Sequence, residues 1–146
     1  ADHAANNADS APRTYIINGF NDYWVEHLSD VTDGNLMSRI NGTAMRDVNI
    51  TEVSDTVLFG EKFYPSGHYY MDLFEPGVTA TGQTGGNQDT QLNQSLHGRA
   101  ANTKGAGGSN YSMADGSSRY VKFGGTFAPV NLWATTANWR TNTLGY

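Results

Sequence analysis

The sequence contains no cysteine, which excludes a disulfide framework and thiolate chemistry. It has no run of lysine or arginine, and its formal net charge is -5. Binding along a nucleic-acid backbone is therefore electrostatically unfavourable, and an anionic membrane surface offers no attraction. No apolar run approaches the roughly 20 residues that a membrane-spanning helix needs. The first twelve residues are polar and do not resemble a signal peptide.

Aromatic residues compensate for a low hydrophobic content of 38%. The 146 residues include eight Tyr, six Phe and three Trp, each able to bury a large area, together with 17 Gly. This composition favours one loop-rich globular domain with short strands over a helical bundle. Together with the elements and the resemblance described below, this composition leads us to expect the α+β class, with a small antiparallel sheet, short helices and long loops. We expect residues 1–12 to form a flexible lead-in or the remnant of a linker, and residues 13–146 to form the globular domain.

Short-range patterns predict the first elements of this domain. Residues 13–17 form a β-prone run that stops at the turn signal Asn18-Gly19. A helix is expected to start with Asn21 and Asp22 as capping residues. A second helix is expected to begin at Thr32 or Asp33 and to end at Asn41-Gly42, because its apolar residues follow helical spacing and an Asn-Gly pair terminates it.

The middle of the chain predicts two more strands and a loop. Residues 56–59 are continuous and apolar and are the best candidate for a buried strand. Residues 68–74 are expected to pair with them as an antiparallel hairpin. Residues 75–94 contain almost nothing apolar and are interpreted as a long surface loop. We expect residues 76–91 and 101–107 to be the most exposed and mobile parts between the termini, since ordering them has little to offset its entropy cost.

The clearest local signal is a hairpin over residues 110–123. Two β-prone runs flank Asp115-Gly116. An Asp-Gly dipeptide is favoured in a two-residue type I′ turn, because this turn needs a positive φ at both central residues. Pairing across a two-residue loop places Tyr111 beside Tyr120. The apolar residues of the tail are expected to cover one edge of the sheet: Phe127, Leu132, Trp133, Trp139 and Tyr146.

An ordered set of short blocks spans most of the chain: Tyr15–Phe20, Asp55–Lys62, Ser66–Asp72, His97, Gly108–Gly116 and Asn131–Ala134. This set resembles the C-terminal processing-associated domain of bacterial type IV pilin-like proteins, the His-x9-Asp-Gly pseudopilins. Such proteins carry a Gly-Ser-Asn-Tyr-x-x-Ala-Asp-Gly block and then Asn-Leu-Trp-Ala. The residues that match the family motif, with a structural role, are His97, Asn110, Asp115, Gly116, Asn131 and Trp133.

One spacing departs from the family pattern. Seventeen residues separate His97 from Asp115, where the family name implies nine. The extra residues fall between Ala100 and Gly108 and are rich in Ala, Gly, Asn and Thr, which suggests a surface insertion. Because the entropy cost of loop closure rises slowly with length, the fold tolerates such an insertion.

The resemblance implies a function without catalysis. Family members begin with a basic leader and a long hydrophobic helix, and their globular heads hang a sheet on that helix. The sequence in hand is then expected to be the C-terminal head of a longer precursor, anchored in the inner membrane by a helix absent here and exposed to the periplasm or cell surface. Its partners would be pilin-like subunits and the export machinery, in a type IV pilin-like or type II secretion pseudopilus filament.

A head that normally meets a hydrophobic helix should expose an apolar patch, expected to draw on Val57, Phe59, Tyr70 and Trp133. A secreted β-rich glycan-binding module is the alternative, because Tyr, Trp and Asn also form sugar-binding surfaces. A small hydrolase ranks last. Asp115 has serines around it and His97 before it, but no Gly-x-Ser-x-Gly context exists, and a turn explains Asp115-Gly116.

No cofactor is required by these patterns, although the sequence offers two candidate metal sites. His68 and Asp72 share a face if they lie in one strand, so they could bind a metal together with nearby carboxylates. A strand histidine bonded to backbone is the preferred interpretation. Calcium is the second case, since some pseudopilins bind it in a C-terminal loop. Asp89 and Asp115 are the candidate ligands, with Asn87 and Asn93 beside them, but no EF-hand pattern is present.

Overall fold

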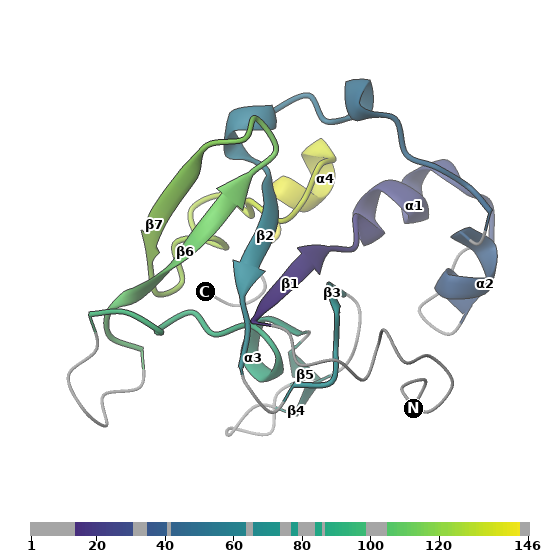
Figure 1. The fold of residues 1–146 in the computed structure, drawn as a ribbon. Helices are drawn as coiled ribbons and strands as arrows, with labels where there is room; N and C mark the ends of the chain where they lie inside the picture. Colours follow the sequence, from purple (N-terminus) through teal and green to yellow (C-terminus); the bar gives the residue numbers. More distant parts are fainter. Residues whose placement is uncertain are drawn as a thin grey trace.

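In the computed structural model the chain is an α+β protein built on a five-stranded mixed sheet, in the order β3-β1-β2-β6-β7 (Figure 1). The structure describes residues 14–30, 35–40, 42–63, 66–73, 77–78, 84–85, 87–98 and 105–143. The expected lead-in, residues 1–12, lies outside them. Within the described residues no helix combines the length and apolarity needed to cross a membrane.

The elements are short. The sheet consists of β1 Tyr15–Asn18, β2 Val57–Glu61, β3 Tyr70–Met71, β6 Gly108–Met113 and β7 Ser118–Lys122. A separate two-stranded sheet pairs β4 Gly77–Val78 with β5 Thr84–Gly85. The helices are α1 Asn21–His27, α2 Leu36–Ile40, α3 Asn87–Thr90 and α4 Ala137–Arg140, with 3-10 turns η2 Asp47–Asn49 and η3 Val53–Asp55.

Strand β1 confirms the prediction of a strand near residues 13–17 and lies inside the sheet. It pairs antiparallel with β2 and parallel with β3. The predicted hairpin between residues 56–59 and 68–74 is therefore wrong, because β1 lies between their strands. The Ile17 N–H donates to the Tyr69 carbonyl at 3.0 Å, and the Gly19 N–H to the Met71 carbonyl at 3.1 Å. The parallel pair also makes the sheet mixed rather than antiparallel.

The hairpin of β6 and β7 confirms the prediction for residues 110–123, but its register is one residue away from the expected one. Ser112 pairs with Ser118, and the Met113 N–H donates to the Ser117 carbonyl at 2.8 Å. Three residues, 114–116, therefore form the loop, and only Gly116 has a positive φ, of 84°. A type I turn followed by a left-handed glycine has this geometry.

The shifted register separates the two tyrosines that the sequence predicts to be neighbours. Tyr111 pairs with Arg119, and Tyr120 pairs with Asn110. Since side chains alternate along a strand, Tyr111 and Tyr120 lie on opposite faces of the sheet. Tyr111 is 2% exposed and Tyr120 is 52% exposed. The predicted Tyr111–Tyr120 contact is therefore wrong.

One face of the sheet is covered by the core, to which the C-terminal segment contributes Phe127 and Trp133, both fully buried. Figure 1 shows this segment and α4 behind β2 and β6, and the Val57 N–H donates to the Leu132 carbonyl at 2.7 Å. The prediction that the tail covers an edge of the sheet is therefore wrong for these two side chains, which pack on its face. The other core residues are Ile16, Val57, Met71, Leu73, Leu92, Tyr111 and Met113.

Helix α1 begins at Asn21, so Asn21 and Asp22 lie inside the helix and do not cap it. Its N-cap is Phe20, with φ of 51°, and the Phe20 N–H donates to Asn18 Oδ1 at 2.8 Å. Asp22 is instead fully buried. Its Oδ2 accepts the backbone N–H groups of Thr135 and Thr136, each at 2.7 Å. The side chain predicted to cap a helix therefore joins α1 to the segment before α4.

The predicted surface loop over residues 75–94 is wrong at its C-terminal end. Residues 87–90 form α3, and Asn87, Leu92 and Gln94 are buried. The Asn93 N–H donates to the Glu61 carbonyl at 2.9 Å, and the Phe63 N–H to the Gln91 carbonyl at 2.9 Å. These bonds fix the segment beside the end of β2. Much of the remainder, and residues 101–104, lies outside the described residues.

Candidate functional site

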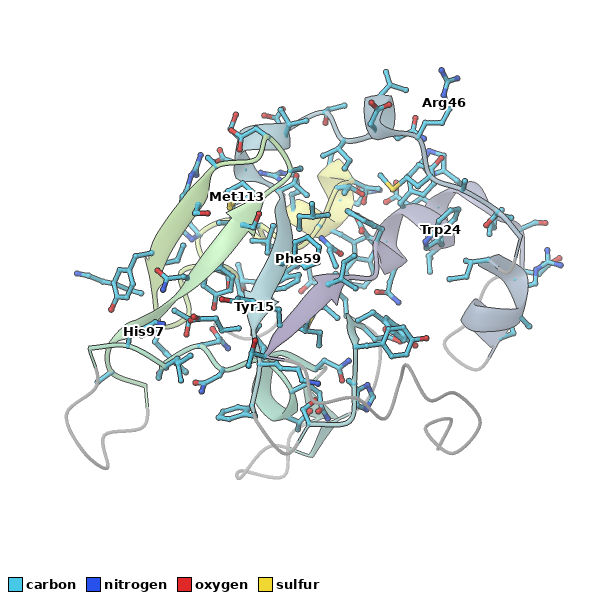
Figure 2. All side chains as sticks on the ribbon, viewed as in Figure 1. Tyr15, Trp24, Arg46, Phe59, His97 and Met113 are labelled. Carbon is cyan, nitrogen blue, oxygen red and sulfur yellow. The ribbon has the colours of Figure 1, made fainter. Side chains whose placement is uncertain are left out.

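The face of the sheet opposite the core carries a row of exposed apolar side chains, called here the open face: Tyr15 and Ile17 of β1, Phe59 of β2 and Tyr120 of β7. Tyr15 is 54% exposed, Ile17 36% and Phe59 38%, whereas Ile16 is fully buried. Ile17 is the registered partner of Phe59, so their side chains are direct cross-strand neighbours. Figure 2 shows Tyr15 and Phe59 on these adjacent strands.

An irregularity in β2 turns Phe59 toward the open face. The register between β2 and β6 shifts between Val57 and Phe59, since Val57 pairs with Met113 while Phe59 pairs with the next residue, Ser112. A bulge of this kind places one extra residue on one strand. As a result Val57 faces the core and is fully buried, although two positions along a regular strand would bring it to the same side as Phe59.

This arrangement corrects the patch expected from the sequence. Phe59 is exposed as predicted, but Val57 and Trp133 are fully buried in the core. Tyr15 and Ile17, which the sequence analysis did not select, take their place. In the structure β1 alternates, with Tyr15 and Ile17 exposed and Ile16 and Asn18 buried, whereas its sequence Tyr-Ile-Ile-Asn has no apolar–polar alternation that identifies the exposed pair.

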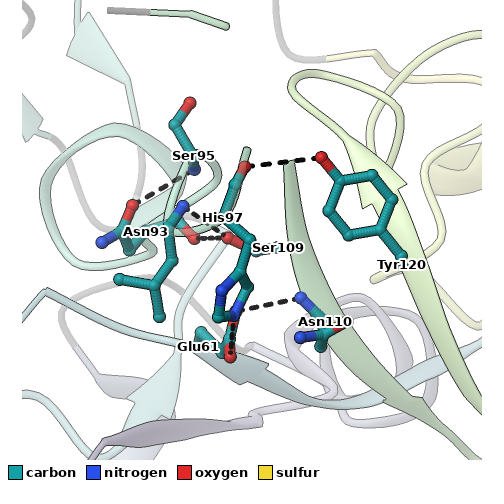
Figure 3. Close-up of polar contacts among 8 residues, drawn as sticks. Glu61, Asn93, Ser95, His97, Ser109, Asn110 and Tyr120 are labelled. Carbon is teal, nitrogen blue, oxygen red and sulfur yellow. Dashed lines mark hydrogen bonds and ion pairs between the residues drawn. The ribbon is translucent and has the colours of Figure 1, made fainter. Parts of the chain in front are cut away.

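A polar cluster borders the open face at the end of β2 (Figure 3). The Glu61 side chain is only 8% exposed, and its two oxygens bind different segments. Oε1 accepts the ring Nε2–H of His97 at 2.9 Å, and Oε2 accepts the backbone N–H of Asn110 at 2.9 Å. A buried carboxylate needs such partners. Glu61 therefore joins β2, β6 and the segment before residue 98.

His97 closes the base of the segment that the sequence predicts to be an insertion. The backbone N–H of His97 donates to the Gly108 carbonyl at 2.8 Å, and the backbone N–H of Gly108 donates to the His97 carbonyl at 3.0 Å. The Tyr120 hydroxyl donates to the His97 carbonyl at 3.4 Å. The residues that flank the segment 98–107 are therefore hydrogen-bonded to each other, and strand β6 begins directly after this segment.

The serine nearest to His97 is not placed for nucleophilic chemistry. The Ser109 hydroxyl donates to the Asn93 carbonyl and accepts the Leu96 N–H at 3.1 Å (Figure 3). A nucleophilic serine needs its hydroxyl within reach of a base. Here the hydroxyl joins two backbone groups, and His97 directs its Nε2 to Glu61.

The family-motif residues separate into three places. His97 and Asn110 meet at Glu61, whereas Asp115 and Gly116 form the tip of the β6–β7 hairpin at the other end of β6. Asn131 and Trp133 lie in the C-terminal segment behind the sheet. There the backbone N–H of Trp133 donates to Asn131 Oδ1 at 3.1 Å. Each residue supports a turn, a bridge or the core.

The exposed Asp115 carboxylate accepts the Ser117 N–H at 2.9 Å. The pKa of Asp115 is lowered mainly by a hydrogen bond from the Ser117 side chain and then by the bond from the Ser117 backbone, and the charge of Arg119 lowers it further. The bond from Asp115 to its own backbone two residues on is typical of a turn. The interpretation of Asp115-Gly116 as a turn is confirmed.

The metal hypotheses receive no geometric support from the described residues, which contain no group of three or more His, Cys, Asp or Glu side chains suited to hold an ion. Asp72 is buried and its Oδ1 accepts the Asn21 amide at 2.9 Å, and His68 lies before β3 rather than in it. Of the calcium candidates, Asp115 is at the hairpin tip, far from α3 in Figure 1. The side chain of Asp89 lies outside the described residues.

Comparisons with family models, with curated proteins and with solved structures find no match for this chain. Its function is therefore argued from the open face and the surrounding geometry. Glu61 is the site residue that the sequence analysis did not select. Its partner His97 lies 36 residues away along the chain, so no local pattern links the two.

Proposed function

We propose that this chain is the globular head of a type IV pilin-like or type II secretion pseudopilin subunit, a structural protein that acts by assembling into a filament. The observation that carries the proposal is the apolar open face on the central strands β1 and β2. Apolar side chains in the middle of a sheet are normally covered by another layer. The core covers the opposite face, so the open face is the place for an additional helix.

The row formed by Tyr15, Ile17 and Phe59 suits a hydrophobic helix supplied by the preceding part of the same subunit. Such a helix buries an apolar stripe against a sheet. In this proposal it also anchors the subunit in the inner membrane and forms the filament core, while the heads contact pilin-like neighbours and the export machinery on the periplasmic side or at the cell surface. No cofactor takes part.

The test begins with the coding sequence upstream of Ala1, which should encode a basic leader and an apolar helix. In the full-length subunit, a cysteine at Ile17 should form a disulfide cross-link with a cysteine in that helix. Val48→Cys is the matched control, because Val48 is exposed to 66% and lies on η2, away from the sheet. The proposal fails if no apolar helix is encoded, or if Val48→Cys cross-links as efficiently as Ile17→Cys.

One observation favours the second candidate, a glycan-binding module. Exposed Tyr120 is the registered partner of Asn110, and with Tyr15 and Phe59 it places three aromatic rings and an amide on the open face. Aromatic rings with a polar neighbour suit the flat faces of sugars. Retardation in polysaccharide-containing gels, lost in Tyr15→Ala and Tyr120→Ala, would support this function over filament assembly.

A further inference from the structure

A pocket lies on the side of the molecule formed by the residues just before η3, by α4 and by the C-terminal segment. Its cavity volume is about 450 Å³, and Glu52, Arg140, Pro129, Val130, Thr135 and Ala137 are among the residues that line it. This size falls within the range of roughly 300–1,000 Å³ typical of small-molecule sites. None of these residues belongs to the open face, so the pocket is independent of what covers the sheet.

Two backbone carbonyls hold Arg140 through Nη1, and among the described residues the rest of its guanidinium has no hydrogen-bond partner. Its Nη1 donates to the Asp55 carbonyl at 3.2 Å and to the Ala134 carbonyl at 3.1 Å. Within the described part of the chain, no carboxylate pairs with Arg140, and its Nη2 and Nε have no partner. A guanidinium fixed in this way is suited to bind a carboxylate through two parallel bonds.

Glu52 supplies the opposite charge without neutralising Arg140. Its carbonyl accepts the Asp55 N–H at 2.9 Å and the Thr56 hydroxyl at 2.9 Å, so its backbone is fixed. Among the described residues its carboxylate has no partner, and it forms no ion pair with Arg140 although both line the pocket. A positively charged and a negatively charged residue therefore line the pocket without pairing with each other, together with the apolar residues Pro129, Val130 and Ala137.

We propose that this pocket binds a free amino acid with an apolar side chain. The ligand carboxylate would accept from Arg140, its ammonium would donate to Glu52, and its side chain would lie on Val130 and Pro129. A ligand with only one charge would pair with either Arg140 or Glu52 and would leave the other residue without a partner. Two complementary contacts to a zwitterion therefore give specificity that a single charge does not.

The experiment titrates the protein with leucine, N-acetyl-leucine and leucinamide and follows backbone amide resonances by NMR. Leucine should shift the resonances of Thr135, Ala137 and Arg140. N-acetyl-leucine lacks the ammonium and leucinamide the carboxylate, so each should bind at least about tenfold more weakly, a loss of about 1.4 kcal/mol. Equal binding of all three compounds, or no shift at these residues, overturns the proposal.

Two variants locate the binding. Glu52→Gln should weaken leucine about tenfold, to the level of N-acetyl-leucine, without changing the affinity for the latter. Its side chain is exposed, so the fold should be unaffected. Asp30→Asn is the matched control, since it removes one negative charge from an exposed position that does not line the pocket. If both variants weaken leucine equally, the effect is general electrostatics and the proposal is wrong.

Discussion

Single polar side chains make the connections between distant segments of this molecule. Asn18 Nδ2 donates to the Val57 carbonyl at 2.8 Å and to the Trp133 carbonyl at 2.9 Å. One amide thereby satisfies buried carbonyls from β2 and from the C-terminal segment. Asp22 of α1 fixes the segment before α4 by accepting two backbone N–H groups, and Glu61 of β2 joins β6 to the segment before residue 98.

Asn18→Ala should lower the free energy of unfolding by about 2–4 kcal/mol, because it leaves two buried carbonyls without a donor. Urea denaturation measures the change. Asn138→Ala removes an exposed bond to Glu26 and should alter stability by less than about 0.5 kcal/mol. A loss for Asn18→Ala no larger than that of the control would show that solvent or a neighbour replaces the amide.

Tyr111 makes stability depend on alkaline pH. Burial raises the pKa of Tyr111 well above its usual 10.0, and the charge of Glu61 adds to this. The folded state keeps the phenol proton at a pH where the unfolded chain loses it. Stability is therefore fully present below about pH 10 and falls as the pH rises further.

The check is the free energy of unfolding measured by urea denaturation from pH 8 to pH 11. The decline above pH 10 should be smaller in Tyr111→Phe than in the parent chain. Tyr120→Phe is the control, because Tyr120 is exposed and should leave the slope unchanged. If the two variants behave alike, buried Tyr111 is not the source of the decline.

At the scale of elements, local signals located what local residues determine. The β-prone run of β1 and the Asp115-Gly116 turn were visible in the sequence, because each depends on neighbouring residues. The register of the hairpin was not visible in the sequence. Asp-Gly suits both a two-residue type I′ turn and a three-residue loop that ends in a left-handed glycine, and the two loops differ by one residue. The parallel pairing of β1 with β3 depends on residues more than 50 positions apart, and so does the position of the bulge relative to β6.

The candidate site was predictable to a similar extent. Phe59 follows from its apolar run, whereas the prediction for Val57 is wrong because the bulge inverts the face of β2 after Val57. The prediction for Trp133 is wrong because the C-terminal segment carries this side chain into the core. The bond between Glu61 and His97 follows from the fold as a whole, since α3 and the segment after it bring His97 to the end of β2. No pattern of neighbouring residues encodes that approach.

Gly60 allows Trp133 to pack closely against β2. A Cβ at this position would lie 2.9 Å from Leu92 Cδ1 and 2.9 Å from a ring carbon of Trp133. Gly60→Ala should therefore destabilise the fold by about 1–3 kcal/mol through overpacking, measured by chemical denaturation. Ser118→Ala on exposed β7 should change stability by less than about 0.5 kcal/mol. Equal effects of the two substitutions would contradict the close packing.

At the scale of the whole molecule, the two faces of the sheet have different roles. The core face holds the domain together through buried residues such as Phe127. The open face presents Tyr15, Ile17 and Phe59, which are available to a partner layer. Stability and the proposed assembly would therefore depend on separate sets of side chains, and substitutions can test them independently.

Phe127→Ala should lower the free energy of unfolding by about 3–5 kcal/mol, because it empties a fully buried site. Phe59→Ala should cost the isolated domain less than about 1 kcal/mol, since that side chain is already 38% exposed. If the chain is the head of a filament subunit, as proposed above, Phe59→Ala should nevertheless reduce filament assembly, measured by sedimentation. A large loss of stability in the isolated Phe59→Ala domain would mean that the open face belongs to the core.

The bond pair between His97 and Gly108 has a practical consequence for protein engineering. Because the two residues are joined to each other, a foreign peptide inserted after Gly98 would leave and re-enter the domain at one place. Lengthening such a segment adds little closure entropy, about 0.6 kcal/mol for each doubling. An epitope or enzyme tag inserted there should be displayed without altering the sheet, and in a filament it would be repeated on every copy.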